Sequence, residues 1–118
     1  MRTSELTGAA LDWAVAEAEG FFKTKMASIT DGKVDVFYFD GYTPSTNWAL
    51  SGEIIESERI CLEDAAGMYW VASLVHEDKE YDGVMRTEMQ GATPLIAAMR
   101  CYVASKLGNE VQLPEELQ

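Results

Sequence analysis

One segment near the C-terminal end constrains the fold more than any other. Thr93 suits the N-cap of a helix, Pro94 its first position, and Gly108 the left-handed position just after its end. Between these caps only Arg100 and Lys106 are charged. The predicted helix has a face of large side chains (Leu95, Ile96, Met99, Tyr102, Val103 and Leu107) and a face of small ones (Ala97, Ala98, Cys101, Ala104 and Ser105). Such a helix is covered on more than one side, by a sheet and then by another helix or subunit.

The first third of the chain predicts a second helix and a strand. Thr3 and Ser4 offer caps for a helix near residues 4–20, and Gly20 is a stop signal. The β-branched and aromatic run from Val34 to Phe39 predicts a strand.

The middle of the chain predicts a hairpin between two loops. Arg59 to Leu62 and Met68 to Val75 are predicted antiparallel strands, and the second is apolar on both faces, which indicates a central position. Asp40 to Gly52 and Glu77 to Gly91 are predicted loops. The second is charged and about fifteen residues long, a length that is usually functional or mobile. Val111 to Gln118 is predicted to be a polar, flexible tail.

These elements predict an α+β fold in one domain over residues 1–118, with a small antiparallel sheet packed against two helices. A hydrophobic content of 47% is typical of a globular protein. We expect these core residues: Leu11, Val15, Trp70, Leu95, Met99 and Val103. Cys61 and Cys101 are predicted to be reduced core residues of an intracellular protein, with a disulfide as the alternative. The sequence shows no signal peptide and no run that would span a membrane.

The charge balance of the chain limits the classes of molecule that it is expected to bind. Twenty acidic and nine basic residues give a net charge of −11, which disfavours direct binding of nucleic acid. An acidic exterior either keeps a small protein soluble or meets a basic partner surface.

The sequence offers no recognisable catalytic motif. His76 is the only histidine, and at the end of a strand it is predicted to be a solvated side chain rather than a catalytic base. A glycine-rich phosphate loop, a zinc ligand set and a calcium loop are missing from the sequence. We therefore expect a protein that is not an enzyme and that has no catalytic residue, metal site or cofactor.

Recognition residues are present instead. Flat rings stack on bases or sugars, hydroxyl and amide groups fix orientation, and a helix start with a nearby arginine binds anions. The candidate ligand-binding residues are Tyr42, Ser45, Thr46, Asn47, Trp48, Thr93, Pro94 and Arg100. Two alternatives remain open at this point: Trp48 anchors its loop in the core, and Arg100 is a structural partner of a carboxylate.

Three motifs in order along the chain resemble a known family. They are residues 4–16, residues 45–49 followed by Gly52 and Ile54-Ile55-Glu56, and residues 91–108, which match most closely. The chain resembles the small NinX-type proteins of lambdoid phages and prophages, a family with a domain of unknown function. Where the family has Gly-Gly-Pro before two isoleucines, this chain has Ser51-Gly52-Glu53, and the carboxylate of Glu53 disfavours an anion site beside it.

The resemblance implies a phage accessory protein that acts in the cytoplasm of an infected bacterium, and it supplies no catalytic residues. In that setting we expect a non-catalytic binder that sequesters a nucleotide-derived immune signal. The alternative is an acidic inhibitor or DNA mimic that blocks a host defence protein. We also expect a homo-oligomer, with a dimer as first choice, formed through the small-residue face of the last helix or an exposed sheet edge.

Overall fold

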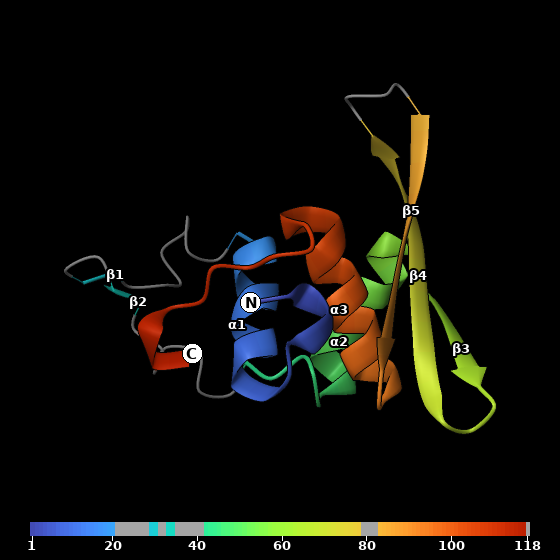
Figure 1. Ribbon diagram of the computed structural model, residues 1–118, viewed down its shortest axis with the longest axis horizontal. Helices are drawn as coiled ribbons and strands as arrows, with labels where there is room; N and C mark the ends of the chain where they lie inside the picture. The colour runs from blue at the N-terminus through green and yellow to red at the C-terminus, as the bar shows by residue number, and fades with distance from the viewer. Residues whose placement is uncertain (21–28, 31–32, 35–41, 79–82, 118) are drawn as a thin grey trace.

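The computed structural model describes residues 1–20, 29–30, 33–34, 42–78 and 83–117 (Figure 1). Its helical elements are η1 (Thr3–Glu5), α1 (Gly8–Ala18), α2 (Trp48–Glu58), α3 (Pro94–Leu107) and η4 (Glu115–Leu117). Its strands are β1 (Ile29–Thr30), β2 (Lys33–Val34), β3 (Cys61–Ala65), β4 (Tyr69–Asp78) and β5 (Gly83–Gly91). Together they form one α+β globule, as the sequence predicts.

The main sheet has three antiparallel strands in the order β3-β4-β5. Cys61 pairs with Ser73 in the first ladder, and Val75 pairs with Arg86 in the second. The predicted hairpin and the central position of its second strand are therefore confirmed. A separate two-stranded ladder joins β1 and β2, so Val34 is the last residue of β2. The rest of the strand predicted over residues 34–39 lies outside the described residues.

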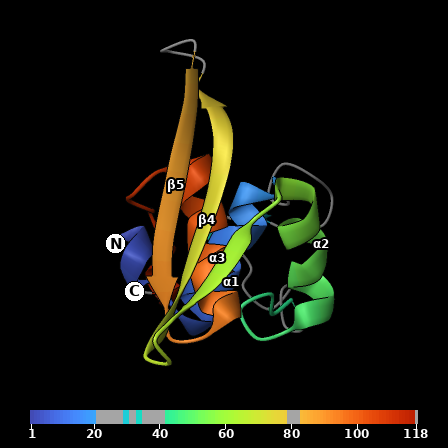
Figure 2. The same ribbon diagram turned by 90° about the vertical axis from the view of Figure 1, so that its right-hand side faces the viewer.

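Helix α3 lies between the sheet and α1, with α2 beside it (Figures 1 and 2). The three helices run in the same direction and begin at the lower end of both views. This arrangement buries both faces of α3. The small residues Ala97, Ala98 and Cys101 are fully buried within the single chain.

The predicted boundaries of α3 are confirmed. The Thr93 side chain accepts a hydrogen bond from the Ile96 backbone N–H at 3.1 Å, and Pro94 occupies the first turn. Gly108 has a φ of +89°, which suits glycine, and its N–H donates to Ala104 O at 3.0 Å. Gly91, just before the helix, allows the close approach of strand and helix, because a Cβ there would overlap the backbone of Ala97.

The first predicted helix divides into two elements. Residues 3–5 form the short helix η1, and α1 begins only after the N-cap residue Thr7. Thr3 is buried, and its hydroxyl donates to Gly108 O at 2.7 Å, so it ties the two chain ends together instead of capping α1. Gly20 ends the helix as predicted, with a φ of +81°.

Two of the predicted loops are wrong. The loop predicted over residues 40–52 ends in helix α2, which Asn47 caps; its buried positions Ser51 and Ile54 lie on a single helical face. The loop predicted over residues 77–91 contains the end of β4 and all of β5. Charged and half-exposed residues alternate along β5, and a mostly exposed strand has too weak an apolar pattern to be recognised from sequence.

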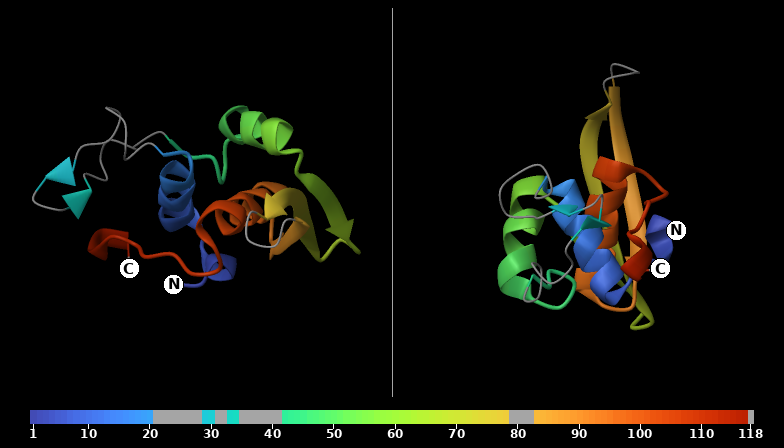
Figure 3. Two further views of the ribbon diagram at one scale, coloured as in Figure 1. Left: turned by 90° about the horizontal axis from the view of Figure 1, so that it is seen from above. Right: turned by 90° about the vertical axis from the view of Figure 1, so that its left-hand side faces the viewer.

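The segment after α3 contributes to the core, although its sequence predicts a polar tail. Val111 and Leu113 are both 5% exposed, and Val111 N–H donates to Met1 O at 2.9 Å. The red C-terminal segment runs back along α1 in Figure 3.

The predicted core is confirmed, except that Trp70 is only half-buried and Cys61 is exposed. Leu11, Val15, Met99 and Val103 are fully buried, and Leu95 is nearly so. Trp70 is half-buried against the same cluster. Both cysteines are free, but only Cys101 is buried; Cys61 is exposed on the edge strand β3, so its prediction as a core residue is wrong.

We expect Met99→Ala to lower the free energy of unfolding by about 2–5 kcal/mol, because it opens a cavity at a fully buried site. Chemical denaturation measures this change. Met68→Ala is the control, since Met68 is 80% exposed and its truncation should change stability by less than about 0.5 kcal/mol. Equal effects of the two substitutions would contradict the central position of α3.

Candidate functional site

The segment that precedes α2 is fixed against α1 by hydrogen bonds. Ser45 N–H donates to Asp12 Oδ1 at 2.8 Å, and Ser45 itself is buried. Burial raises the pKa of the Asp12 carboxyl above its ordinary value, although the hydrogen bonds from Ser45 oppose the shift. Thr46 hydroxyl donates to Thr43 O at 3.4 Å within the turn. These polar groups serve the local fold, and Asp12 brings a carboxylate to this point.

Two tyrosines lie where this segment meets α1 and α3. Burial raises the pKa of Tyr42, and the nearby carboxylates of Glu19 and Asp12 raise it further. Burial also raises the pKa of Tyr102, and the nearby carboxylates of Glu19 and Glu58 raise it further. Tyr42 is half-buried and packs against the core, so its ring is only partly available for stacking.

Helix α2 presents an outward face that carries an exposed tryptophan. Asn47 Oδ1 accepts a hydrogen bond from Ala49 N–H at 2.9 Å and thereby caps the helix. Trp48, the first helical residue, is 56% exposed, so it does not anchor the segment in the core. Glu53 and Glu56 are exposed as well, while Ser51 and Ile54 on the opposite side are buried. We call Trp48, Ala49, Glu53 and Glu56 the α2 outer face.

Arg100 is bound to the backbone of two other segments. Its Nε donates to Leu6 O and its Nη1 to Gln90 O, each at 2.8 Å, and burial lowers its pKa. The guanidinium group therefore joins α3 to the start of the chain and to the end of β5. Arg100 is a structural residue, as one alternative predicts, but its partners are carbonyl groups and not a carboxylate.

The structure brings only part of the predicted ligand site together. Residues 42–48 form one continuous group beside α1 and at the start of α2. Lys106 of α3 pairs with Glu58 of α2 at 3.4 Å, and Arg100, six residues earlier, projects from a different side of α3 toward Leu6 and β5. The Thr93 side chain is occupied as the cap of α3, and Pro94 lies beside it at the same end of the molecule as the start of α2 (Figure 2).

The structure adds residues that sequence reasoning did not assign to the site. Asp12 lies on α1, far from Ser45 in sequence, and no local pattern links the two residues. Glu53 and Glu56 are recognisable as one face only once α2 is known to be a helix. The signal that predicts α2 is Asn47 as N-cap, followed by apolar residues at helical spacing.

The other reactive side chains have structural contacts. His76 Nε2 lies 3.0 Å from Thr87 Oγ1 across the β4–β5 ladder. Burial raises the pKa of the Cys101 thiol to about 12, and its Sγ donates to Thr87 O at 3.3 Å. Within the described part of the chain, no three His, Cys, Asp or Glu side chains are grouped so as to hold a metal ion. Its helices include none that is long and apolar enough to cross a membrane.

The fold is that of a small α+β protein with three parallel helices and a three-stranded sheet. The sequence model of a family described as "Bacteriophage P22, NinX" matches residues 2–106. The chain belongs to this phage family. A comparison with curated proteins gives no match.

We expect Arg100→Ala to lower the free energy of unfolding by about 2–3 kcal/mol, because it leaves the Leu6 and Gln90 carbonyls without their charged donor. Arg100→Lys should be intermediate, since an ammonium group cannot replace both guanidinium contacts in their fixed geometry. Arg2→Ala removes a positive charge from an exposed residue and serves as the control in the same denaturation series. An unchanged stability of Arg100→Ala would show that the two hydrogen bonds are dispensable.

Proposed function

We propose that this NinX-family protein acts without catalysis, in the cytoplasm of the infected bacterium, by binding a basic surface of a host protein through the α2 outer face. The family assignment supports the phage setting. The exposure of Trp48 on a helix that is otherwise packed against α3 carries the proposal.

An exposed tryptophan at the start of a helix suits a protein interface. Tryptophan is enriched among the residues that supply most of the binding energy at such interfaces. Ala49 beside it is small and exposed, so a partner can reach the indole ring from that side. Helix α2 lies at the edge of the molecule in Figure 2, where a partner can approach.

The surrounding charge favours a basic partner. Glu53 and Glu56 are exposed on the same helix as Trp48, and the net charge of the whole chain is −11. Carboxylates around an apolar anchor increase the association rate with a basic surface and add specificity. The same carboxylates, with Asp12 beside Ser45, repel a phosphate group.

We expect Trp48→Ala to weaken binding to the host partner about 30-fold, which corresponds to the loss of about 2 kcal/mol at a central interface residue. The partner is captured from bacterial lysate at low salt, identified by mass spectrometry, purified and titrated against the wild type and the variant. Met68→Ala, which removes a more exposed apolar side chain elsewhere, should leave the affinity unchanged.

The contribution of the two carboxylates to binding is tested in the same titration, with a control of equal charge change. Glu53→Gln with Glu56→Gln should weaken binding and reduce its salt dependence, because fewer charges remain to be screened. Glu63→Gln with Asp64→Asn removes the same charge from exposed residues of β3 and should have little effect. Binding that is independent of salt and of Trp48 would contradict the proposal.

A second candidate is the sequestration of a nucleotide-derived ligand by residues 42–48. One arrangement favours it: the exposed Trp48 ring stands at the same end of the molecule as the starts of α2 and α3, where helix dipoles favour a negative group (Figure 2). Tyr42, Ser45, Thr46 and Asn47 would then orient the ligand, with Thr93 and Pro94 close to the phosphate. Arg100 would contribute through α3 rather than by direct contact.

This second candidate predicts that an intact nucleotide is released when the protein is denatured after incubation with extracts of cells that carry nucleotide-signalling defences. Mass spectrometry of the released fraction should find the ligand with the wild type and with Met68→Ala, but not with Trp48→Ala. A cleaved product would indicate an enzyme instead. The absence of any released nucleotide across several such extracts would leave the protein-binding proposal alone.

A further inference from the structure

Strand β5 has one long edge that is available for pairing. It pairs with β4 on one side, and no strand in the described part of the chain pairs with the other side. Its nine residues extend over about 30 Å. Edge strands in monomeric proteins are usually short or protected by lysine, proline or a bulge. Strand β5 contains neither lysine nor proline, and its charged residues are one arginine and one glutamate, Arg86 and Glu88.

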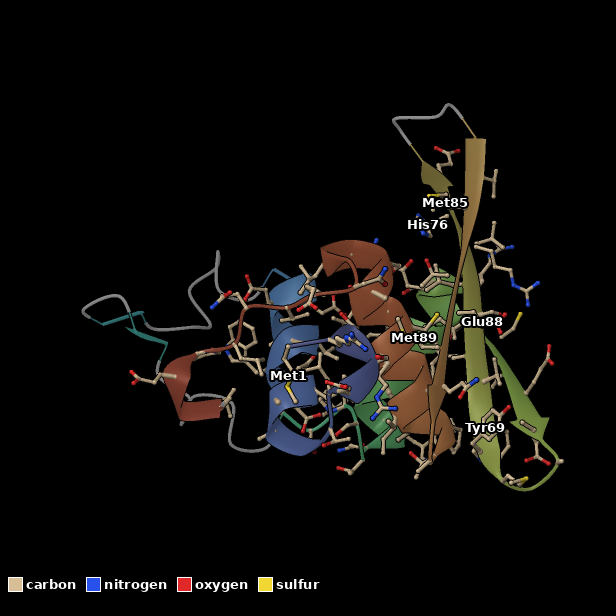
Figure 4. All side chains as sticks on the ribbon, viewed as in Figure 1. Met1, Tyr69, His76, Met85, Glu88 and Met89 are labelled. Carbon is tan, nitrogen blue, oxygen red and sulfur yellow. The ribbon has the colours of Figure 1, made fainter. Side chains whose placement is uncertain are left out.

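The β4–β5 hairpin extends beyond the helices that cover its lower half (Figures 1 and 2). Three apolar side chains on this projecting part are strongly exposed: Val75 at 61%, Val84 at 69% and Met85 at 47%. Figure 4 shows Met85 and His76 on the same side of the hairpin as the helices, but above them. Met89, lower on the same side of β5, packs against the core. On the helix-facing side of this projecting part, Met85 is not covered by a helix of the described chain, whereas Val75 and Val84 lie on the opposite face, with Arg86.

The charges of β5 are arranged symmetrically about Thr87. Arg86 precedes Thr87 and Glu88 follows it. Glu88 projects from the face of the sheet away from α3 (Figure 4), and Arg86, two residues earlier on the strand, lies on the same face. Within one chain Arg86 Nη2 lies 3.6 Å from Glu88 Oε2, and both side chains are more than half exposed. A strand that places opposite charges equally far on either side of one residue is complementary to an antiparallel copy of itself.

We propose that two copies of this chain pair through their β5 edges, antiparallel about a two-fold axis at Thr87, and form a continuous six-stranded sheet. In this register Arg86 lies opposite the partner's Glu88, and the same contact occurs a second time across the axis. Directly opposite charges in a sheet stabilise the pairing, whereas like charges destabilise it. This isologous arrangement is typical of two-fold dimers.

The same register places Met85 opposite the partner's Met89. Because Met89 lies over α3 in its own copy, the partner's helices come beneath the projecting hairpin, and Met85 becomes covered. At its other end, the edge of β5 is closed by Arg100, which binds Gln90 O and Leu6 O. The pairing therefore centres on residues 84–88, where both the exposed apolar side chains and the charge pair lie.

This inference is independent of the proposed function, since Trp48 lies on α2 and not on the β5 edge. A dimer would present two copies of the α2 outer face to a partner. The failure of either proposal would leave the other unaffected.

Charge reversal tests the register directly. Light scattering coupled to size exclusion should give twice the chain mass of 13.1 kDa for the wild type at micromolar concentration. Arg86→Glu and Glu88→Arg each place like charges opposite one another, so each alone should raise the dissociation constant at least tenfold. An equimolar mixture of the two variants should restore the dimer, because every opposed pair is then of opposite charge; the double variant should also restore it.

The mixture shows whether the charges act between two copies or within one chain. Neither single variant retains the Arg86–Glu88 ion pair within its own chain, so recovery of the dimer in the mixture must come from contacts between the copies. Glu63→Arg, a reversal of equal size on the other edge strand, is the control and should remain dimeric, and circular dichroism checks that every variant is folded. A wild-type mass of 13.1 kDa at several hundred micromolar would overturn the proposal. A dimer that resists both single variants, or variants that fail to combine, would overturn it as well.

Discussion

The burial of most of α3, between the sheet and α1, is the constraint on which the rest of the structure depends. Its small residues Ala97 and Ala98 allow other elements to approach closely, while Met99 and Val103 fill the remaining volume. The same packing requires glycine at position 91, because a Cβ atom there would overlap the backbone of Ala97. Once α3 is central, the sheet and α1 lie on opposite sides of it.

Arg100 shows how this constraint also fixes the first and last parts of the fold. A long charged side chain on a buried helix must reach polar partners, and the nearest are the carbonyls of Leu6 and Gln90. One guanidinium group thus joins three segments that are far apart in sequence. The chain ends are fixed in a similar way, since Met1 and Val111 exchange backbone hydrogen bonds of 2.9 and 3.0 Å.

Helix α2 and the β4–β5 hairpin each use only part of their surface to cover α3. The remaining part of each surface is available for binding. Helix α2 contacts α3 and leaves Trp48, Glu53 and Glu56 exposed. The β4–β5 hairpin covers α3 with its lower half and extends its upper half beyond the helices. The proposed binding of a basic partner and the proposed dimer therefore use different parts of the molecule. Both proposals are compatible with a phage protein whose family assignment does not include a known activity.

The sequence by itself determined the helix over residues 94–107 with its caps, the hairpin with a central second strand, the family and most of the core. These features depend on local spacing, capping residues and long apolar runs. Only the tertiary structure decided that α2 is a helix, that residues 83–91 are a strand, and that Val111 and Leu113 are buried, because their local patterns are weak. It also decided the roles of the candidate site: Arg100 binds backbone carbonyls, Ser45 meets Asp12, and Trp48 is exposed. Contacts between residues that are far apart in the sequence leave no local sequence pattern. Whether a given side of a helix is buried or exposed depends on the elements that pack against it.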